Sequence, residues 1–268
     1  MKDGLFRIGA ATPCVAVAHV EENRRRILQL IRQGAEEGCG VVCFPELSLT
    51  GYTCGDLFRD RTLLAGAEQA LAALLKDTAD LDLVCVVGVP VPWQGALYNC
   101  GAVFHRGRLL GLPAKVCIPN YSEFYEARHF TPAPSAQEIT YAGQRTWLGR
   151  GLLFPCENVP DLCLGVEICE DLWSPVPPST DLARNGATVL LNPSCSDETI
   201  GKAEYRRELV CQHSGRLLAA YAYVDSGLGE STTDMVFAGH DMIAENGSLL
   251  EESQLFTTGL VTADVDLE

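Results

Sequence analysis

Short, continuously apolar runs alternate along the chain with longer segments in which apolar residues recur every three to four positions. The first pattern predicts strands buried on both faces, and the second predicts amphipathic helices. Strands are expected at residues 6–12, 41–44, 83–91, 97–104, 109–115, 162–168, 188–191 and 217–224, and helices at residues 20–37, 60–78, 178–185 and 200–216. This alternation predicts an α/β fold.

The rest of the chain is predicted to form turns, short strands and one irregular stretch. Residues 105–108 are expected to form a hairpin turn, and residues 131–151 are interpreted as an irregular surface excursion. Near the end, short antiparallel strands are expected at residues 235–237, 241–244, 249–250 and 260–265, around a turn at residues 245–248. The sequence contains no internal repeat or linker, so residues 1–268 are predicted to form a single domain.

Composition excludes several classes of partner. The 268 residues are 47% hydrophobic, enough for one large core, and 35 acidic against 20 basic residues give a net charge of −15. That charge repels nucleic acid and anionic membranes, so neither is expected as a partner. No apolar stretch approaches the ~20 residues of a membrane-spanning helix, and the N-terminus lacks a signal-peptide pattern.

The cysteines and histidines indicate neither disulfides nor a metal site. Many of the twelve cysteines lie inside apolar runs, as small core residues do, which favours the reducing cytoplasm as the location. No cysteine pair has Cys-x-x-Cys spacing and the five histidines are scattered, so no metal is expected.

The most informative stretch is residues 165–173, in which an apolar strand leads into Cys169, with carboxylates on both sides, and then a turn. A strand that stops abruptly projects its last side chain and leaves the next backbone N–H groups free for an oxyanion, as acyl transfer requires. Cys169 is therefore a candidate nucleophile. The alternative is one more buried thiol, which is the commoner fate of a free cysteine.

Two further apolar runs each end at one ionisable residue. Residues 41–46 end at Glu46, and residues 109–115 end at Lys115. Because ligand crevices form at strand ends in open α/β folds, Glu46, Lys115 and Cys169 are expected to share one pocket. Taken singly, Glu46 is better explained as a carboxylate at a helix start and Lys115 as a solvated strand end.

In this chain order, Phe44-Pro45-Glu46, Lys115 and Cys169 resemble the Glu-Lys-Cys triad of the nitrilase superfamily. Three longer stretches narrow the resemblance to the glutamine-hydrolysing domain of bacterial glutamine-dependent NAD synthetases, and the similarity covers essentially the whole chain. Those stretches are residues 48–58, 118–130 and 169–175. The resemblance implies a four-layer α-β-β-α sandwich with two mixed sheets, which is more than the hydrophobic pattern alone predicts.

The resemblance also implies a mechanism, the hydrolysis of glutamine to glutamate and ammonia through a thioester on Cys169. Glu46 is then the general base, and Lys115 stabilises the oxyanion together with the backbone N–H of Glu170. Glu126 resembles a second glutamate of this superfamily that orients the lysine. The alternative for Glu126 is a surface carboxylate paired with Arg128.

Glutamine recognition needs groups of opposite charge around its α-ammonium and α-carboxylate. By similarity, the candidates are Glu170, which would bind the ammonium, with Tyr121, Phe124, Ser196 and Lys202. The synthetases tend to have arginine at the position of Lys202, and a lysine lacks the bidentate fork of a guanidinium. A solvated lysine at a helix start is therefore an alternative for Lys202, and a simple turn serine is one for Ser196.

In the synthetases, this domain is followed by a second domain with a Gly-rich pyrophosphate loop, and no such loop occurs in this chain. We expect that synthetase domain as a partner, in cis or in trans, within a homo-oligomer. ATP and Mg²⁺ would bind there, and no cofactor is expected in this domain. The chain is then either an excised domain or a separately encoded subunit.

Two alternatives stay open at the level of sequence. The first is a free-standing nitrilase-type amidase or carbamoylase acting on another small amide, which a comparison of substrates separates from a glutaminase. The second is a non-catalytic scaffold for a synthetase oligomer, against which the complete triad argues.

Overall fold

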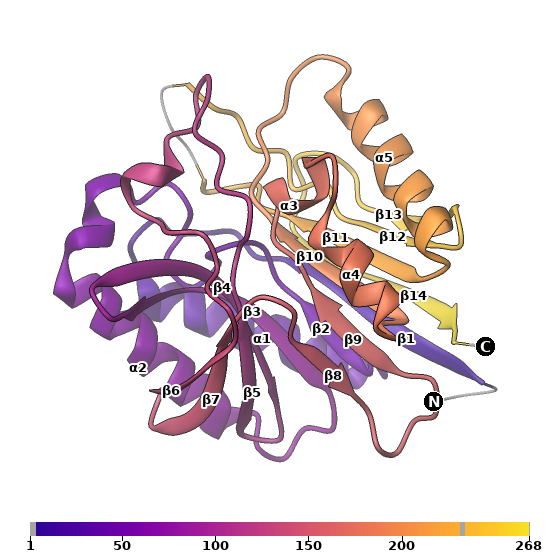
Figure 1. Ribbon diagram of the computed structural model, residues 1–268, viewed down its shortest axis with the longest axis horizontal. Coiled ribbons are helices and arrows are strands. Elements are labelled where there is room, and N and C mark those ends of the chain that lie inside the picture. The colour runs from indigo at the N-terminus through magenta and orange to yellow at the C-terminus, as the bar shows by residue number, and fades with distance from the viewer. Residues whose placement is uncertain (1–3, 231–233, 268) are drawn as a thin grey trace.

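Two mixed β-sheets pack face to face in the computed structural model, which describes residues 4–230 and 234–267 (Figure 1). Within these residues, the eight-stranded sheet has the order β14-β1-β2-β3-β4-β5-β7-β6 and the six-stranded sheet the order β13-β12-β11-β10-β9-β8. The first sheet contains β1 (Leu5–Thr12), β2 (Val41–Cys43), β3 (Val84–Trp93), β4 (Ala96–His105), β5 (Arg108–Pro113), β6 (Gln137–Tyr141), β7 (Gln144–Gly149) and β14 (Gly259–Asp266). The second contains β8 (Leu153–Pro155), β9 (Cys163–Val166), β10 (Val189–Ser194), β11 (Ala220–Asp225), β12 (Met242–Glu245) and β13 (Ser248–Glu252).

Helices cover the outer face of each sheet. The apolar stripes of α1 (Val20–Glu36) and α2 (Arg61–Asp77) pack on the first sheet, and α3 (Glu170–Trp173), α4 (Pro178–Arg184) and α5 (Lys202–Leu217) pack on the second (Figure 1). Two 3₁₀ turns, Gly55–Arg59 and Glu126–Arg128, lie in the loops. The predicted four-layer α-β-β-α sandwich is confirmed.

Strand periodicity divides the core into layers. Along β10, Val189 and Leu191 belong to the core between the two sheets, whereas Leu190 belongs to the core under α4 and α5. Successive strand side chains point to opposite faces, so a strand covered on both sides must be apolar at every position. This explains the continuous apolar runs of the sequence.

The architecture brings several strand ends to one edge. Strands β1, β2 and β3 are parallel in the first sheet, as are β9, β10 and β11 in the second. The N–H of Glu46, just beyond β2, donates to the carbonyl of Ser194 at the end of β10 (3.2 Å). Gly88 of β3 permits this arrangement, because a Cβ there would lie 2.1 Å from the backbone nitrogen of Leu47.

Two of the sequence-based predictions are wrong. The stretch 131–151 is not irregular, because β6 and β7 form an antiparallel hairpin at the edge of the first sheet. Its turn residues Ala142 and Gly143 both have positive φ (50° and 75°), the conformation of a tight hairpin turn. Residues 235–237 do not form a strand either, and Phe237 makes only an isolated bridge to Asp197. Within the described residues, no helix is long and apolar enough to cross a membrane.

Candidate active site

Glu46 lies fully buried three residues beyond β2, with one of its two carboxylate oxygens occupied. Its Oε1 accepts hydrogen bonds from Asn99 Nδ2 (2.5 Å) and Lys115 Nζ (2.6 Å). Its Oε2 is buried and makes no hydrogen bond within the described residues. Glu46 is therefore held in one orientation, with a free oxygen available to accept a proton.

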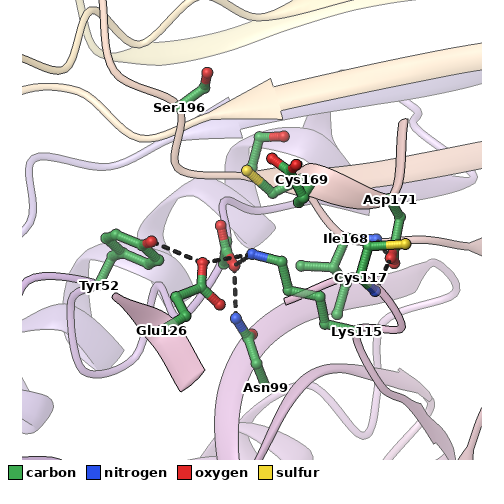
Figure 2. Close-up of polar contacts among 12 residues, drawn as sticks. Tyr52, Asn99, Lys115, Cys117, Glu126, Ile168, Cys169, Asp171 and Ser196 are labelled. Atoms are coloured by element: carbon green, nitrogen blue, oxygen red, sulfur yellow. Dashed lines mark hydrogen bonds and ion pairs between the residues drawn. The ribbon is translucent and has the colours of Figure 1, made fainter. Parts of the chain in front are cut away.

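Lys115 lies just beyond β5 and bridges two carboxylates. Its Nζ is 2.6 Å from Glu46 Oε1 and 2.6 Å from Glu126 Oε1, and its side chain is fully buried. Glu126 Oε1 also accepts from the Tyr52 hydroxyl (2.7 Å), as Figure 2 shows. The pairing that we considered for Glu126 with Arg128 does not occur, because Arg128 binds Asp56 and Glu126 faces inward.

Cys169 lies between β9 and α3 in a strained backbone conformation, with φ 47° and ψ −100°. Such a conformation costs an ordinary residue about 1–3 kcal/mol, and strain of this kind is found mainly at functional sites. Its side chain is buried and lies over the Lys115–Glu126 ion pair (Figure 2). The next residue, Glu170, begins α3, so its N–H has no acceptor within the helix and remains available to an oxyanion.

Asp171 ties the turn of Cys169 to the segment that follows Lys115. Its carboxylate accepts from the N–H groups of Ile168 (2.9 Å), Val116 (3.1 Å) and Cys117 (2.7 Å). Lys115 thus comes from the first sheet and Cys169 from the second, and the fully buried carboxylate of Asp171 fixes the distance between their segments (Figure 2).

Burial and neighbouring charges set the protonation of the three candidate groups. Burial, more than the opposing ammonium of Lys115, raises the pKa of Glu46 to about 7. Burial followed by the Glu46 carboxylate raises the pKa of the Cys169 thiol well above its usual range. Burial disfavours the charge on Lys115, but the carboxylates of Glu126 and Glu46 outweigh it and raise its pKa. At neutral pH, a neutral thiol therefore faces a charged lysine and a carboxylate that titrates near 7.

Three of the five residues proposed for substrate recognition are linked by direct contacts: Glu170, Tyr121 and Phe124. The hydroxyl of the exposed Tyr121 donates to both carboxylate oxygens of the half-buried Glu170 (3.0 Å each), and Phe124 packs edge-on against Tyr121. Lys202, the first residue of α5, pairs with Asp197 and lies 5.3 Å from the centre of the Trp173 ring. Ser196 is buried, and its N–H donates to Asp225 (2.8 Å).

No group of three or more His, Cys, Asp or Glu side chains that would suit a metal ion occurs within the described ranges. Two surface cavities, of about 750 and 440 Å³, have none of Glu46, Lys115 or Cys169 in their walls. The groups that the structure brings together are an acid–base pair, a thiol and a free N–H.

Residues 7–268 match the family model described as carbon-nitrogen hydrolase. The chain belongs to this family. The glutamine-dependent NAD(+) synthetase of Mycobacterium tuberculosis is 42% identical over 268 residues, which cover 99% of this chain but 40% of that protein. The chain thus spans about 40% of the length of such relatives.

Solved structures have the same fold. The crystal structure of a glutamine-dependent NAD(+) synthetase from Cytophaga hutchinsonii matches with a TM-score of 0.87 and 28% identity, over 97% of this chain and 43% of that chain. An amidase from Nesterenkonia sp. matches with a TM-score of 0.78 and 17% identity, over 100% of this chain and 93% of that one. At that identity, the amidase shows the fold alone.

Four side chains that the sequence analysis did not single out complete the site. Asn99 and Tyr52 hold the two glutamates, Asp171 joins the two halves, and Asn192 accepts the N–H of Cys169 (2.9 Å). Asn99 lies within the largely apolar strand β4 and Asn192 follows three apolar residues in β10, and both are fully buried or nearly so. A buried amide needs hydrogen-bond partners, so an Asn that interrupts or directly follows an apolar run was the available signal.

Proposed function

We propose that this chain hydrolyses the side-chain amide of glutamine to glutamate and ammonia, and that the ammonia serves a NAD synthetase domain. The observation that carries the proposal is the fully buried Lys115, shared between Glu46 and Glu126 beneath Cys169. Burying three charged side chains costs free energy, so a function for them is expected. Together with Cys169 they supply the base, the oxyanion donor and the nucleophile of amide hydrolysis. The names of the relatives indicate glutamine as the amide and NAD synthesis as the purpose.

The first half of the reaction acylates the enzyme. The free Oε2 of Glu46 takes the thiol proton as Cys169 Sγ attacks the amide carbon. This proton transfer is required because the raised pKa of Cys169 keeps the thiol neutral. The third N–H of Lys115 and the N–H of Glu170 stabilise the oxyanion, at about 3 kcal/mol per donor. Glu46 then returns the proton to the leaving nitrogen, the C–N bond breaks, and ammonia leaves a γ-glutamyl thioester.

The second half regenerates the thiol. Glu46 removes a proton from water, the resulting hydroxide attacks the thioester carbonyl, and the oxyanion is stabilised by the same two donors. Collapse breaks the C–S bond and releases glutamate, and Cys169 recovers the proton from Glu46. Glu126 positions Lys115 throughout, because its Oε1 is anchored by Tyr52.

Substrate binding is assigned to the residues at the start of α3 and α5. Glu170, held by Tyr121, binds the α-ammonium, and Phe124 and Ser196 line the approach. Lys202 binds the α-carboxylate, and the existing pair with Asp197 orients it. The described cysteines are free thiols, which fits the reducing cytoplasm that we propose as the location.

We propose further that residues 1–268 act as one catalytic unit beside a synthetase domain, in cis or in trans, within a homo-oligomer. ATP and Mg²⁺ belong to that domain, and this unit needs no cofactor of its own. Support comes from the self-contained set of reacting groups and from the relatives, of whose length this chain matches about 40%.

The test compares the chain with its Cys169→Ala variant. We expect glutamate and ammonia to form in equal amounts from glutamine, and the variant to lose at least about 10³-fold in rate with an unchanged melting temperature, because Ala fills nearly the same space as the thiol. ω-Amides lacking the α-groups and N-carbamoyl amino acids should react far more slowly. Retention of a tenth of the activity would remove Cys169 from the mechanism, and a faster reaction with another amide would favour the free-standing amidase.

A further inference from the structure

A buried chain of hydrogen bonds begins at the backbone of Cys169 and leads away from the catalytic groups. The N–H of Cys169 donates to the carbonyl of Pro193 (3.0 Å) and to the side-chain oxygen of Asn192 (2.9 Å). Both acceptors belong to β10. They therefore hold the backbone of Cys169, whose φ of 47° and ψ of −100° are strained and need support from the surrounding structure.

The amide of Asn192 is itself held from behind. Its Nδ2 donates to the Tyr221 hydroxyl (2.9 Å), and that hydroxyl donates to Glu167 Oε1 (2.5 Å). Glu167 Oε2 accepts the N–H of Ser179 (2.8 Å) at the start of α4. Asn192 and Tyr221 are fully buried and Glu167 nearly so, so water does not compete for these bonds.

The direction of each bond in this chain is fixed by chemistry. Burial raises the pKa of Glu167 to about 7, and above that pH its carboxylate only accepts, so the single proton of the Tyr221 hydroxyl points to Glu167. The hydroxyl oxygen is then an acceptor, and only the NH₂ end of the Asn192 amide can donate to it. The oxygen end of that amide consequently faces the N–H of Cys169, and a flipped amide would place two donors against each other.

We propose that Tyr221, backed by Glu167, is a positioning residue that fixes the Asn192 amide and through it the strained backbone of Cys169. The inference rests on the proposed role of Cys169 as nucleophile. Held in this way, the thiol lies over Lys115 and the Glu170 N–H stays directed away from the helix. Without the hydroxyl, the Nδ2 end of the amide loses its partner, and its oxygen end is held only by the N–H of Cys169 and by Ser194 Oγ (2.7 Å). The amide is then less firmly oriented, and the reactive geometry at Cys169 is populated only part of the time.

The chain offers a matched control two residues along the same strand. Tyr223 is also fully buried and lies in the same apolar cluster between β11 and the helices. Its hydroxyl makes no hydrogen bond within the described residues. Removing that hydroxyl changes the packing of the same layer and breaks none of the bonds that link Cys169, Asn192, Tyr221 and Glu167.

The experiment compares Tyr221→Phe with Tyr223→Phe in the full chain, by glutamine kinetics and by the rate at which iodoacetamide alkylates Cys169, followed by peptide mapping. We expect Tyr221→Phe to lower kcat about tenfold with KM within twofold, and to slow alkylation of Cys169 by a similar factor. For Tyr223→Phe, kcat, KM and the alkylation rate of Cys169 should all stay within twofold of the parent values. The melting temperature of each variant shows that the fraction folded is the same.

Equal kcat values and alkylation rates for the two variants would overturn the proposal. If Tyr221→Phe does not fold, Glu167→Gln takes its place. The Nε2 of the new glutamine cannot accept the N–H of Ser179, so the group that anchors Tyr221 is loosened. A Glu167→Gln variant with the kcat and alkylation rate of the parent would overturn the proposal equally. Alkylation does not depend on the substrate. If the parent chain fails to hydrolyse glutamine while the alkylation difference persists, the proposed substrate is wrong and the positioning role stands.

Discussion

The reacting groups and the recognition groups of the proposed site are held in different ways. Glu46 and Lys115 are fully buried beyond the ends of β2 and β5, and each makes two short hydrogen bonds to buried side chains. Tyr121 is exposed, Glu170 is half-buried, and Lys202 lies on the first turn of α5. Glu46 and Lys115 follow strands of the first sheet and Cys169 follows β9 of the second, so the reacting groups are held by the sheets. The recognition groups depend on loops and helix starts.

This difference has an energetic consequence. A buried charge that loses its partner keeps the full cost of desolvation, so each reacting group requires the others to be in place. An exposed charge that loses a partner regains water, and its loss costs little. Substitutions among the reacting groups should therefore act on kcat by large factors, and substitutions among the recognition groups should act on KM by small ones.

The largest effect is expected for Lys115→Met, which keeps the volume of the side chain and removes its ammonium. We expect kcat for glutamine to fall about 10²–10³-fold with KM within threefold, because the lost donor acts on the oxyanion and not on the ground-state amide. The matched control is Lys202→Met, which removes the other lysine near the site. Steady-state kinetics of both variants, with circular dichroism to verify the fold, make the comparison. An unchanged kcat with a raised KM would show that Lys115 binds substrate instead.

The same contrast decides what the sequence could predict. Glu46 and Lys115 were predictable because an apolar run that ends in one charged residue marks a buried strand end, and both lie where that reasoning places them. Asn99 and Asn192 were not singled out, because their role depends on which strands become neighbours across the two sheets. The hairpin of β6 and β7 was missed for a related reason. It lies at a sheet edge, where alternate residues are exposed and the apolar signal is weak.

Lys202 marks the limit of prediction from sequence. The alternatives were a ligand of the substrate carboxylate and a solvated lysine at a helix start. The structure places its ammonium against Asp197 and beside the Trp173 ring, so it is not simply solvated. The contact with Asp197 is local, five residues along the chain, but the contact with Trp173 is not, because Trp173 lies in α3, after a different strand.

An intermediate effect is expected from pH, through Glu46. Its pKa of about 7 means that the carboxylate is protonated at lower pH and cannot accept the thiol proton. We expect kcat/KM to fall about tenfold per pH unit below the midpoint and to level off above it. Replacing Glu170 by Gln should leave the midpoint in place, whereas Lys115→Met should move it upward, because the ammonium that lowers the pKa of Glu46 is gone. A profile that is flat from pH 5.5 to 8 would exclude Glu46 as the base.

The smallest effect is expected for Lys202→Met. Its charge is already paired with Asp197, so the α-carboxylate of glutamine gains only part of a full ion pair, and we expect KM to rise about fivefold with kcat within twofold. Lys202→Arg should match or improve on the parent, because a guanidinium binds a carboxylate through two parallel hydrogen bonds. The decisive measurement uses 4-aminobutanamide, which keeps the amide and the ammonium of glutamine but lacks the α-carboxylate. Parent and Lys202→Met should have the same KM for this compound, since the proposed contact no longer exists. If KM for glutamine is unchanged in Lys202→Met, or if both substrates respond equally, Lys202 stabilises the start of α5 through Asp197 and Trp173, and the carboxylate of glutamine is bound elsewhere.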